Sequence, residues 1–337
     1  MKQIFLIGLV ATTMLASCNN DETMQISQSK TIGFSNAFVN KGTRSIIDPS
    51  FTTSTLTDFA VYGFTQNGQI FNGTTVNGKD WTYTPLQYWI AGNIYTFGAI
   101  APAAQSSNVS KVTLSNNIIG MEVAFTNSDV DQIDLLHAAP AVINCDETFI
   151  ANPTKVNMTF NHQLSKVKFS FENAVGDGYN VKVTNVLITN AYTTGTLTIA
   201  STGNSWGVQA ENTLSIAFGN VVADDATTNE AAVIANAETL ESYNEKLMIP
   251  SDATAEYTVT FTVELLQGNV SLGTFNHATT ISGIELQSGY CYDFKASLTN
   301  ENVVDPENPL KPIEFNVDNI ENWNDSSVDQ TLDITTI

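Results

Sequence analysis

Hydrophobic and polar residues alternate with a period of two along most of this chain, which is the pattern of half-buried β-strands. Turn signals such as Asn67-Gly68 and Asn77-Gly78 separate the alternating segments. Only residues 226–246 have a helical composition, which predicts a short helix or a long loop. The short, evenly spaced segments favour antiparallel β-sandwiches over βαβ units. The predicted strands are 31–39, 59–65, 94–100, 111–114, 123–125, 156–160, 164–172, 181–190, 195–200, 214–218, 257–266, 273–281, 290–298 and 313–317.

The length of 337 residues allows two domains of ordinary size. A hydrophobic content of 42% is enough for a packed core. The least structured junction between the two sets of strands is residues 152–154. We therefore expect an N-terminal domain over 45–153 and a C-terminal domain over 154–337.

The first residues have the order of a secretion signal, in which Lys2 precedes an apolar run and a box of small residues before Cys18. Cleavage before Cys18 would remove residues 1–17 as a signal peptide and leave a thiol that can carry lipid. An ordinary signal peptide with a chance cysteine is the alternative. The order predicts a lipoprotein that is attached to a membrane through Cys18 and soluble beyond it.

Arg44 is the only arginine among the 13 basic residues. It lies in a polar segment, residues 40–45, without strand or helix periodicity, and such a segment is readily cut by proteases. A protease that prefers arginine would find this single site and cut between Arg44 and Ser45. The alternative is that the chain merely uses lysine in place of arginine.

Charge and motifs restrict the class of function. A net charge of −21 and a pI of about 4.2 argue against nucleic acid as a partner, because phosphates would be repelled. The carboxylates of Asp129, Asp131 and Asp134 lack the turn glycine and the further oxygen ligands of a calcium loop. Cys145 and Cys291 are too far apart in sequence for a disulfide framework, and the alternatives are two buried small hydrophobic residues or one long-range bridge. We therefore expect no enzyme, no metal and no cofactor.

Three blocks of the sequence together resemble the fimbrillin-like pilins of Bacteroidetes, the family of Mfa-like lipoprotein pilins that includes major and minor fimbrial subunits. The blocks are residues 34–44, which contain a strand and the arginine; residues 81–102, with Trp81-Thr82-Tyr83-Thr84-Pro85 and Tyr88-Trp89; and residues 160–169, with Trp323 as a later match. Gly98 and Ile100 depart from the family pattern, in which bulkier or more polar residues are usual. The resemblance extends over nearly all of the chain.

The resemblance implies an all-β protein with two tandem transthyretin-like antiparallel β-sandwich domains. It also implies a lipoprotein precursor in the cell outer membrane, with residues 18–44 as a lipidated propeptide. An arginine-specific protease would cut after Arg44, and the subunit would then join other pilin subunits in a surface fimbrium by strand exchange. Adhesion to a host or bacterial surface ligand and biofilm formation follow from the same resemblance.

The two ends of the chain fit this implied assembly. The apolar face of the strand at 31–39 (Ile32, Phe34 and Phe38) would fill a groove in the first domain until cleavage released it. Residues 328–335 alternate in the same way and are the candidate donor strand, with Val328, Leu332 and Ile334 on one face. The two faces match in reversed order, which suggests opposite directions in the groove. The alternative is that the tail is the last edge strand of the second domain.

Several positions and functions stay open. The alternating tail favours a shaft subunit, which receives and donates a strand, over a tip subunit, which only receives one. An anchor subunit would keep its lipid, and Arg44 argues against it. A surface glycan-binding lipoprotein is a second class, because Trp81, Tyr83, Tyr88 and Trp89 could form a stacking platform, although these residues also suit core packing. A secreted hydrolase has no supporting motif.

Overall fold

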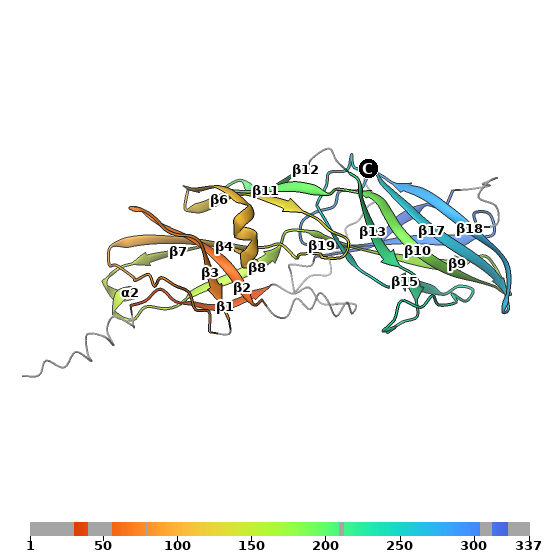
Figure 1. Ribbon diagram of the computed structural model, residues 1–337, viewed down its shortest axis with the longest axis horizontal. Coiled ribbons are helices and arrows are strands. Elements are labelled where there is room, and N and C mark those ends of the chain that lie inside the picture. The colour runs from red at the N-terminus through yellow and green to blue at the C-terminus, as the bar shows by residue number, and fades with distance from the viewer. Residues whose placement is uncertain (1–29, 40–55, 79, 209–211, 304–311, 323–337) are drawn as a thin grey trace, which may run out of the picture.

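The structure is a computed structural model of the full chain, and it describes residues 30–39, 56–78, 80–208, 212–303 and 312–322. It is nearly all β, with four sheets arranged in two lobes along one long axis (Figure 1). The predicted all-β class is therefore confirmed. No helix among these residues is long and apolar enough to cross a membrane.

The first lobe is built on a sheet of six strands that is buried on both faces. The strand Asp58–Thr65 shows this, because Phe59 and Val61 belong to one apolar cluster and Ala60 and Tyr62 to another. In spatial order the strands are β1 (Phe34–Val39), β8 (Val156–His162), β7 (Leu136–Cys145), β4 (Asn93–Ala101), β2 (Asp58–Thr65) and β3 (Gly68–Asn77).

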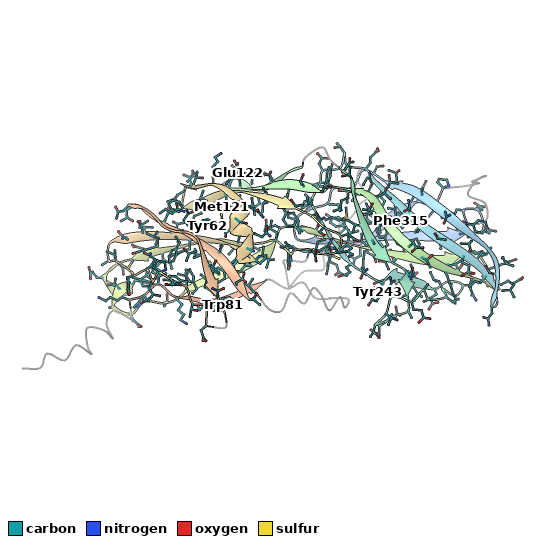
Figure 2. All side chains as sticks on the ribbon, viewed as in Figure 1. Tyr62, Trp81, Met121, Glu122, Tyr243 and Phe315 are labelled. Carbon is teal, nitrogen blue, oxygen red and sulfur yellow. The ribbon has the colours of Figure 1, made fainter. Side chains whose placement is uncertain are left out.

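A four-stranded sheet covers one face of this six-stranded sheet. Tyr62 from β2 and Met121 from the covering sheet belong to the cluster between them and are labelled in the first lobe of Figure 2. The covering strands are β12 (Gly203–Val208), β11 (Thr194–Ala200), β6 (Ile118–Thr126) and β5 (Val109–Ser115), and two short helices, η2 (Ala103–Asn108) and α2 (Glu147–Ala151), complete the lobe.

The second lobe is a sandwich of two sheets around the largest apolar cluster, which includes Phe169, Phe218 and Phe261. Its alternating strands bury one face each, as in Tyr257–Gln267, where every second residue from Tyr257 to Leu265 is buried. One sheet contains β13 (Leu214–Gly219), β10 (Tyr179–Ala191), β17 (Tyr257–Gln267) and β18 (Val270–Ile281); the other contains β14 (Val221–Val222), β15 (Thr239–Ser242), β9 (Ser165–Ala174), β19 (Tyr290–Thr299), β20 (Phe315–Asn322) and β16 (Lys246–Met248), which pairs with β9.

Strands from both sides of the expected domain boundary at residues 153–154 belong to the same sheets. Strand β8 follows that position but pairs with β7 and β1, and the hairpin β11–β12 joins β6 of the first lobe. The limits of independently folding domains stay a prediction, but the division between sheets does not fall at 153–154. Residues 226–246 contain no helix: they form turns and strand β15, and end at the first residue of β16.

Candidate functional site

The candidate site is the groove that holds residues 30–39 at the edge of the six-stranded sheet. Strand β1 lies parallel to β8, with Phe34 opposite Val156 and Ser35 opposite Asn157. Thr31, just before β1, forms an antiparallel bridge with Tyr88. The segment is therefore inserted between β8 and residues 87–89.

Backbone hydrogen bonds hold the segment from both sides. Ile32 N donates to Gln87 O at 2.8 Å, and Trp89 N donates to Lys30 O at 2.8 Å. On the other side, Val156 N donates to Gly33 O at 2.7 Å. Removal of the segment would leave these groups of the groove without their partners, which is costly for buried backbone.

Phe34 is the side chain that fills the groove. It is 1% exposed, and its neighbour along the segment, Ile32, is 0% exposed. Aromatic rings approach Phe34 edge-on, which is a favoured geometry for ring pairs. The centroid distances from Phe34 are 5.8 Å to Phe59, 5.8 Å to Phe71, 5.6 Å to Tyr83 and 6.1 Å to Phe97.

Tyr83 contacts both the side chain and the backbone of the inserted segment. Its hydroxyl donates to Ile32 O at 2.7 Å and accepts from Gln87 N at 3.2 Å. Burial raises the pKa of this hydroxyl, against a lowering by the hydrogen bond with Gln87, so it stays protonated and can donate at neutral pH. Tyr83 is thus a wall of the Phe34 pocket and a hydrogen-bond donor to the segment's backbone.

A bulge interrupts the expected alternation of the segment. The register with β8 shifts between Ser35 and Phe38, so Phe38 pairs with Thr159 and Val39 with Phe160. A bulge of one residue exchanges the two faces of a strand beyond it. The pairing with β8 is therefore irregular beyond Ser35, and the displaced-strand role of Ile32, Phe34 and Phe38 stays a prediction.

The other predicted site residues lie outside the described residues. They are the lipidation candidate Cys18, the cleavage pair Arg44 and Ser45, and the donor candidates Val328, Leu332 and Ile334. Their roles stay predictions.

The aromatic residues proposed as a glycan platform are mostly packed inside the first lobe. Trp89 is 3% exposed and lies 4.8 Å from Tyr95 between ring centroids. Trp81 packs on Phe59 at 5.5 Å, and only Tyr88 is exposed, at 46%. The four residues therefore do not share one exposed face on which a sugar could stack.

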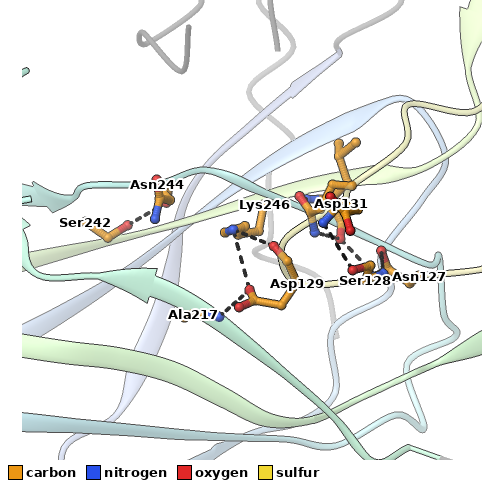
Figure 3. A network of polar contacts seen from close by, with 10 residues as sticks. Asn127, Ser128, Asp129, Asp131, Ala217, Ser242, Asn244 and Lys246 are labelled. Carbon is orange, nitrogen blue, oxygen red and sulfur yellow. Dashed lines mark hydrogen bonds and ion pairs between the residues drawn. The ribbon is translucent and has the colours of Figure 1, made fainter. Parts of the chain in front are cut away.

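The acidic loop 127–134 joins the two lobes, a role that sequence patterns did not indicate. The Asp129 carboxylate accepts from Ala217 N at 2.8 Å and lies 3.5 Å from Lys246 Nζ (Figure 3). Lys246 Nζ also donates to Asp129 O at 2.8 Å, and Gln132 exchanges two hydrogen bonds with the Leu247 backbone. Within the described ranges, no cluster of His, Cys, Asp and Glu is arranged to hold a metal ion.

The two cysteines of the described chain are free thiols. Cys145 lies in the first lobe at the end of β7, and Cys291 lies in the second lobe on β19. Burial raises the pKa of Cys291 to about 12, so its thiol is protonated and unreactive at neutral pH. Neither thiol is positioned as a nucleophile.

Comparisons with known proteins agree with this architecture. A family model described as Fimbrillin-like matches residues 43–323. The comparison with curated proteins finds no match. A fimbrial protein from Bacteroides vulgatus ATCC 8482 has a similar structure, with a TM-score of 0.52 and 17% sequence identity over 87% of this chain and 99% of that one.

Two further solved structures are more distant. A candidate cell adhesion protein from Bacteroides ovatus ATCC 8483 has a TM-score of 0.47 and 14% identity, covering 88% of this chain and 98% of that one. The fimbrial anchor protein Mfa2 from Porphyromonas gingivalis has a TM-score of 0.30 and 12% identity, covering 81% and 91%. Because the family model spans well over half of the sequence, the chain belongs to the fimbrillin-like family of fimbrial structural proteins.

Proposed function

We propose that this protein is a structural subunit of cell-surface fimbriae, without catalytic activity, that assembles by strand exchange after proteolysis. The precursor is held in the outer membrane by lipid on Cys18 and cut after Arg44 by an arginine-specific protease. The observation that carries the proposal is the burial of Ile32 and Phe34. These two residues precede Arg44, the only arginine of the chain, and their side chains complete the apolar core of the first lobe. A cut after Arg44 would therefore separate part of this core from the rest of the chain.

Cleavage would change the energetics of this groove. Burying the Ile32 and Phe34 side chains contributes about 3–6 kcal/mol of transfer free energy. A cut after Arg44 would allow residues 30–39 to leave the groove. Their departure would expose the four rings around Phe34 and leave backbone groups of residues 87–89 without hydrogen-bond partners. A strand from another subunit could enter the groove by β-strand addition. It would restore both the burial of apolar side chains and the backbone hydrogen bonds.

The donor strand in this proposal is the tail at residues 328–335 of a neighbouring subunit. A subunit that both receives and donates a strand is a shaft subunit, whereas a tip subunit would only receive one. We infer the role of the fibre in adhesion and biofilm formation from membership of the fimbrillin-like family. The ligand would be a host or bacterial surface. The packing of Trp81, Tyr83 and Trp89 disfavours the alternative of a glycan-binding lipoprotein.

Lipidation is tested by Cys18→Ala, which should abolish labelling by a fatty-acid analogue and block export to the outer membrane. The reason is that the thiol is the only acceptor for lipid at the signal-peptide junction. Unchanged labelling of the variant would remove the lipoprotein step from the proposal.

Assembly is tested by changing one face of the tail at a time. The triple substitution Val328→Asn, Leu332→Asn and Ile334→Asn should leave a folded, cleavable and exported monomer that forms no fibres. The matched control places the same three asparagines on the other face, at Asp329, Thr331 and Thr335, and should polymerise. Full-length fibres from the first variant, seen by electron microscopy, would show that the tail is not the donor.

A further inference from the structure

We propose that the free edge of β18 is an interaction surface for β18 of a second copy, so that two sheets of the second lobe join into one across a two-fold axis. The two strands would run antiparallel, because a two-fold axis perpendicular to the sheet requires it. The contact is separate from the groove of the first lobe and needs neither cleavage nor strand exchange. In a fimbrium it would join neighbouring fibres side by side, and many weak contacts of this kind would act together.

The edge formed by β18 is long and regular. The strand has 12 residues and is the last strand of its sheet, labelled in the second lobe of Figure 1. It pairs with β17 without interruption from Ile281 to Gly273, and its one register shift lies beyond Gly273. A regular edge strand presents a row of backbone N–H and C=O groups on its outer side.

The backbone groups on this outer side have no hydrogen-bond partner among the described residues. The segment before β20 contacts the strand once, where the Thr279 hydroxyl donates to Ile313 O at 2.7 Å. That hydrogen bond uses a side chain and leaves the backbone edge open. A strand added beside β18 would pair with these backbone groups, as in β-strand addition.

β18 lacks the features that protect most edge strands from pairing with other chains, which are charged residues, proline and bulges. Its sequence contains no Asp, Glu, Lys, Arg or Pro. By contrast, β20 carries Asp318 and Glu321, β5 carries Lys111 and a register shift, and β3 has two register shifts. The edge strands β12 and β13 have only 6 residues each. In the described part of the chain, β18 is therefore the edge most open to another strand.

The charge of the chain favours a second copy as the occupant. With a net charge of −21, most surfaces of two copies repel each other, and a basic partner would bind those acidic surfaces instead. The β18 edge is uncharged, and its cross-strand neighbours include Thr258 and Thr260 of β17. Val270 and Leu272 add exposed apolar side chains at the start of the strand. Two like-charged copies can therefore approach each other at this edge without direct repulsion.

A buried nitrogen without a partner lies on the same strand. The ring of His277 stacks on Phe261, with 5.3 Å between the ring centroids. Its Nε2 atom is buried and has no hydrogen-bond partner, which is uncommon for a buried polar atom. A second β18 would bring another row of side chains, including His277 and Thr279 of the second copy, beside this ring. The unsatisfied nitrogen is thus a second observation that points to a missing neighbour at this edge.

The oligomeric state of the uncut full chain tests the contact without any fibre. In a Cys18→Ser background, analytical ultracentrifugation should show a dimer that increases as the concentration rises to about 1 mM. The exposed pair Ala278→Glu and Thr280→Glu on β18 should weaken the dimer about 5- to 30-fold at low salt, because the added charges of the two copies lie close together. The matched control, Gln69→Glu with Thr75→Glu on the edge strand β3, should not weaken it.

Two results of this experiment would overturn the proposal. One is a chain that stays monomeric at about 1 mM. The other is equal weakening by the β18 pair and the β3 pair, because this would reflect net charge alone. A mixture of the β18 glutamate variant with Ala278→Lys and Thr280→Lys copies should restore dimers, and a mixture that stays monomeric would also count against the contact.

Hydrogen exchange tests whether the backbone edge itself is paired. The amides of residues 273–281 should exchange more slowly in concentrated than in dilute protein, while those of β3 stay unchanged. Dimers without this slowing would use another surface and would overturn the edge pairing. These measurements use the uncut chain, so their failure is distinct from that of the proposed function, which an absence of fibres from cleaved wild-type protein would show.

Discussion

Strands β1 and β20 occupy edges of the two largest sheets, but they are held in opposite ways. β20 pairs with β19 over seven residue pairs in an antiparallel ladder, yet none of its eight residues is fully buried. β1 pairs with β8 over only four residue pairs, and each of the two ladders contains one register shift. The segment that leads into β1 nevertheless places Ile32 and Phe34 in the centre of an apolar cluster.

The difference is one of degree: Phe315 of β20 also packs against core rings, but it stays half-buried, whereas Ile32 and Phe34 are closed to solvent. An edge strand held by its ladder can be lost with little damage to the core. A strand with a short ladder and fully buried side chains leaves an apolar cavity when it is removed. The cavity favours binding of another strand with apolar residues at the same spacing. The β1 edge is therefore the place at which the proposed strand exchange would act.

The sharpest test of this contrast compares one truncation in each strand. Phe34→Ala should lower the free energy of unfolding by about 3–5 kcal/mol, because it empties a pocket lined by four rings. Val317→Ala, a half-buried position of β20, should cost about 1 kcal/mol. Both values come from denaturant unfolding of the uncut chain, and equal costs would contradict the contrast.

The first lobe should also weaken in acid because of His137 on β7. Burial lowers the pKa of His137 to about 4, from an ordinary value of 6.5. Between these values the unfolded chain binds a proton that the folded chain does not, so stability falls as the pH decreases from 6.5 to 4, by up to about 3 kcal/mol.

The variant His137→Gln isolates this contribution, because burial also lowers the pKa of His277 in the second lobe. Unfolding free energies measured at pH 7 and pH 4.5 should differ less in the variant than in the wild type. An identical pH dependence in both proteins would show that His137 is not the group responsible.

A smaller effect is expected from the hydroxyl that binds the backbone of the inserted segment. Tyr83→Phe removes the hydrogen bond to Ile32 O and should cost about 0.5–1.5 kcal/mol. Hydrogen exchange of residues 30–34 should accelerate while the β20 region is unchanged. The control is Tyr88→Phe, a change at an exposed neighbour, and a similar acceleration in the control would remove Tyr83 from the account.

The sequence predicted the type of most elements because alternation is a local property. It identified β9, β10, β17 and β19 within a few residues. It did not predict β7, whose sequence Leu-His-Ala-Ala-Pro-Ala-Val-Ile-Asn-Cys lacks regular alternation. It also could not show that β11 pairs with β6, about 70 residues away in the chain, because partner choice depends on long-range packing.

The same limit applies to the site. Ile32 and Phe34 were found from their spacing, because both face one side of a single segment. Tyr83 was not found, since its role depends on contact with a residue about 50 positions away in the chain. No local pattern marks the acidic loop at 127–134 as a contact between the lobes, because the partners of Asp129 are about 90 and 120 positions away in the chain.

The most direct test of strand exchange is the N-terminal residue of the subunit recovered from assembled fibres on cells. If the segment at 31–39 is removed to open the groove, mass spectrometry and N-terminal sequencing should find Ser45 first, with no peptide containing Phe34. Fibres built from subunits that still carry residues 31–39 in their own chain would contradict the account.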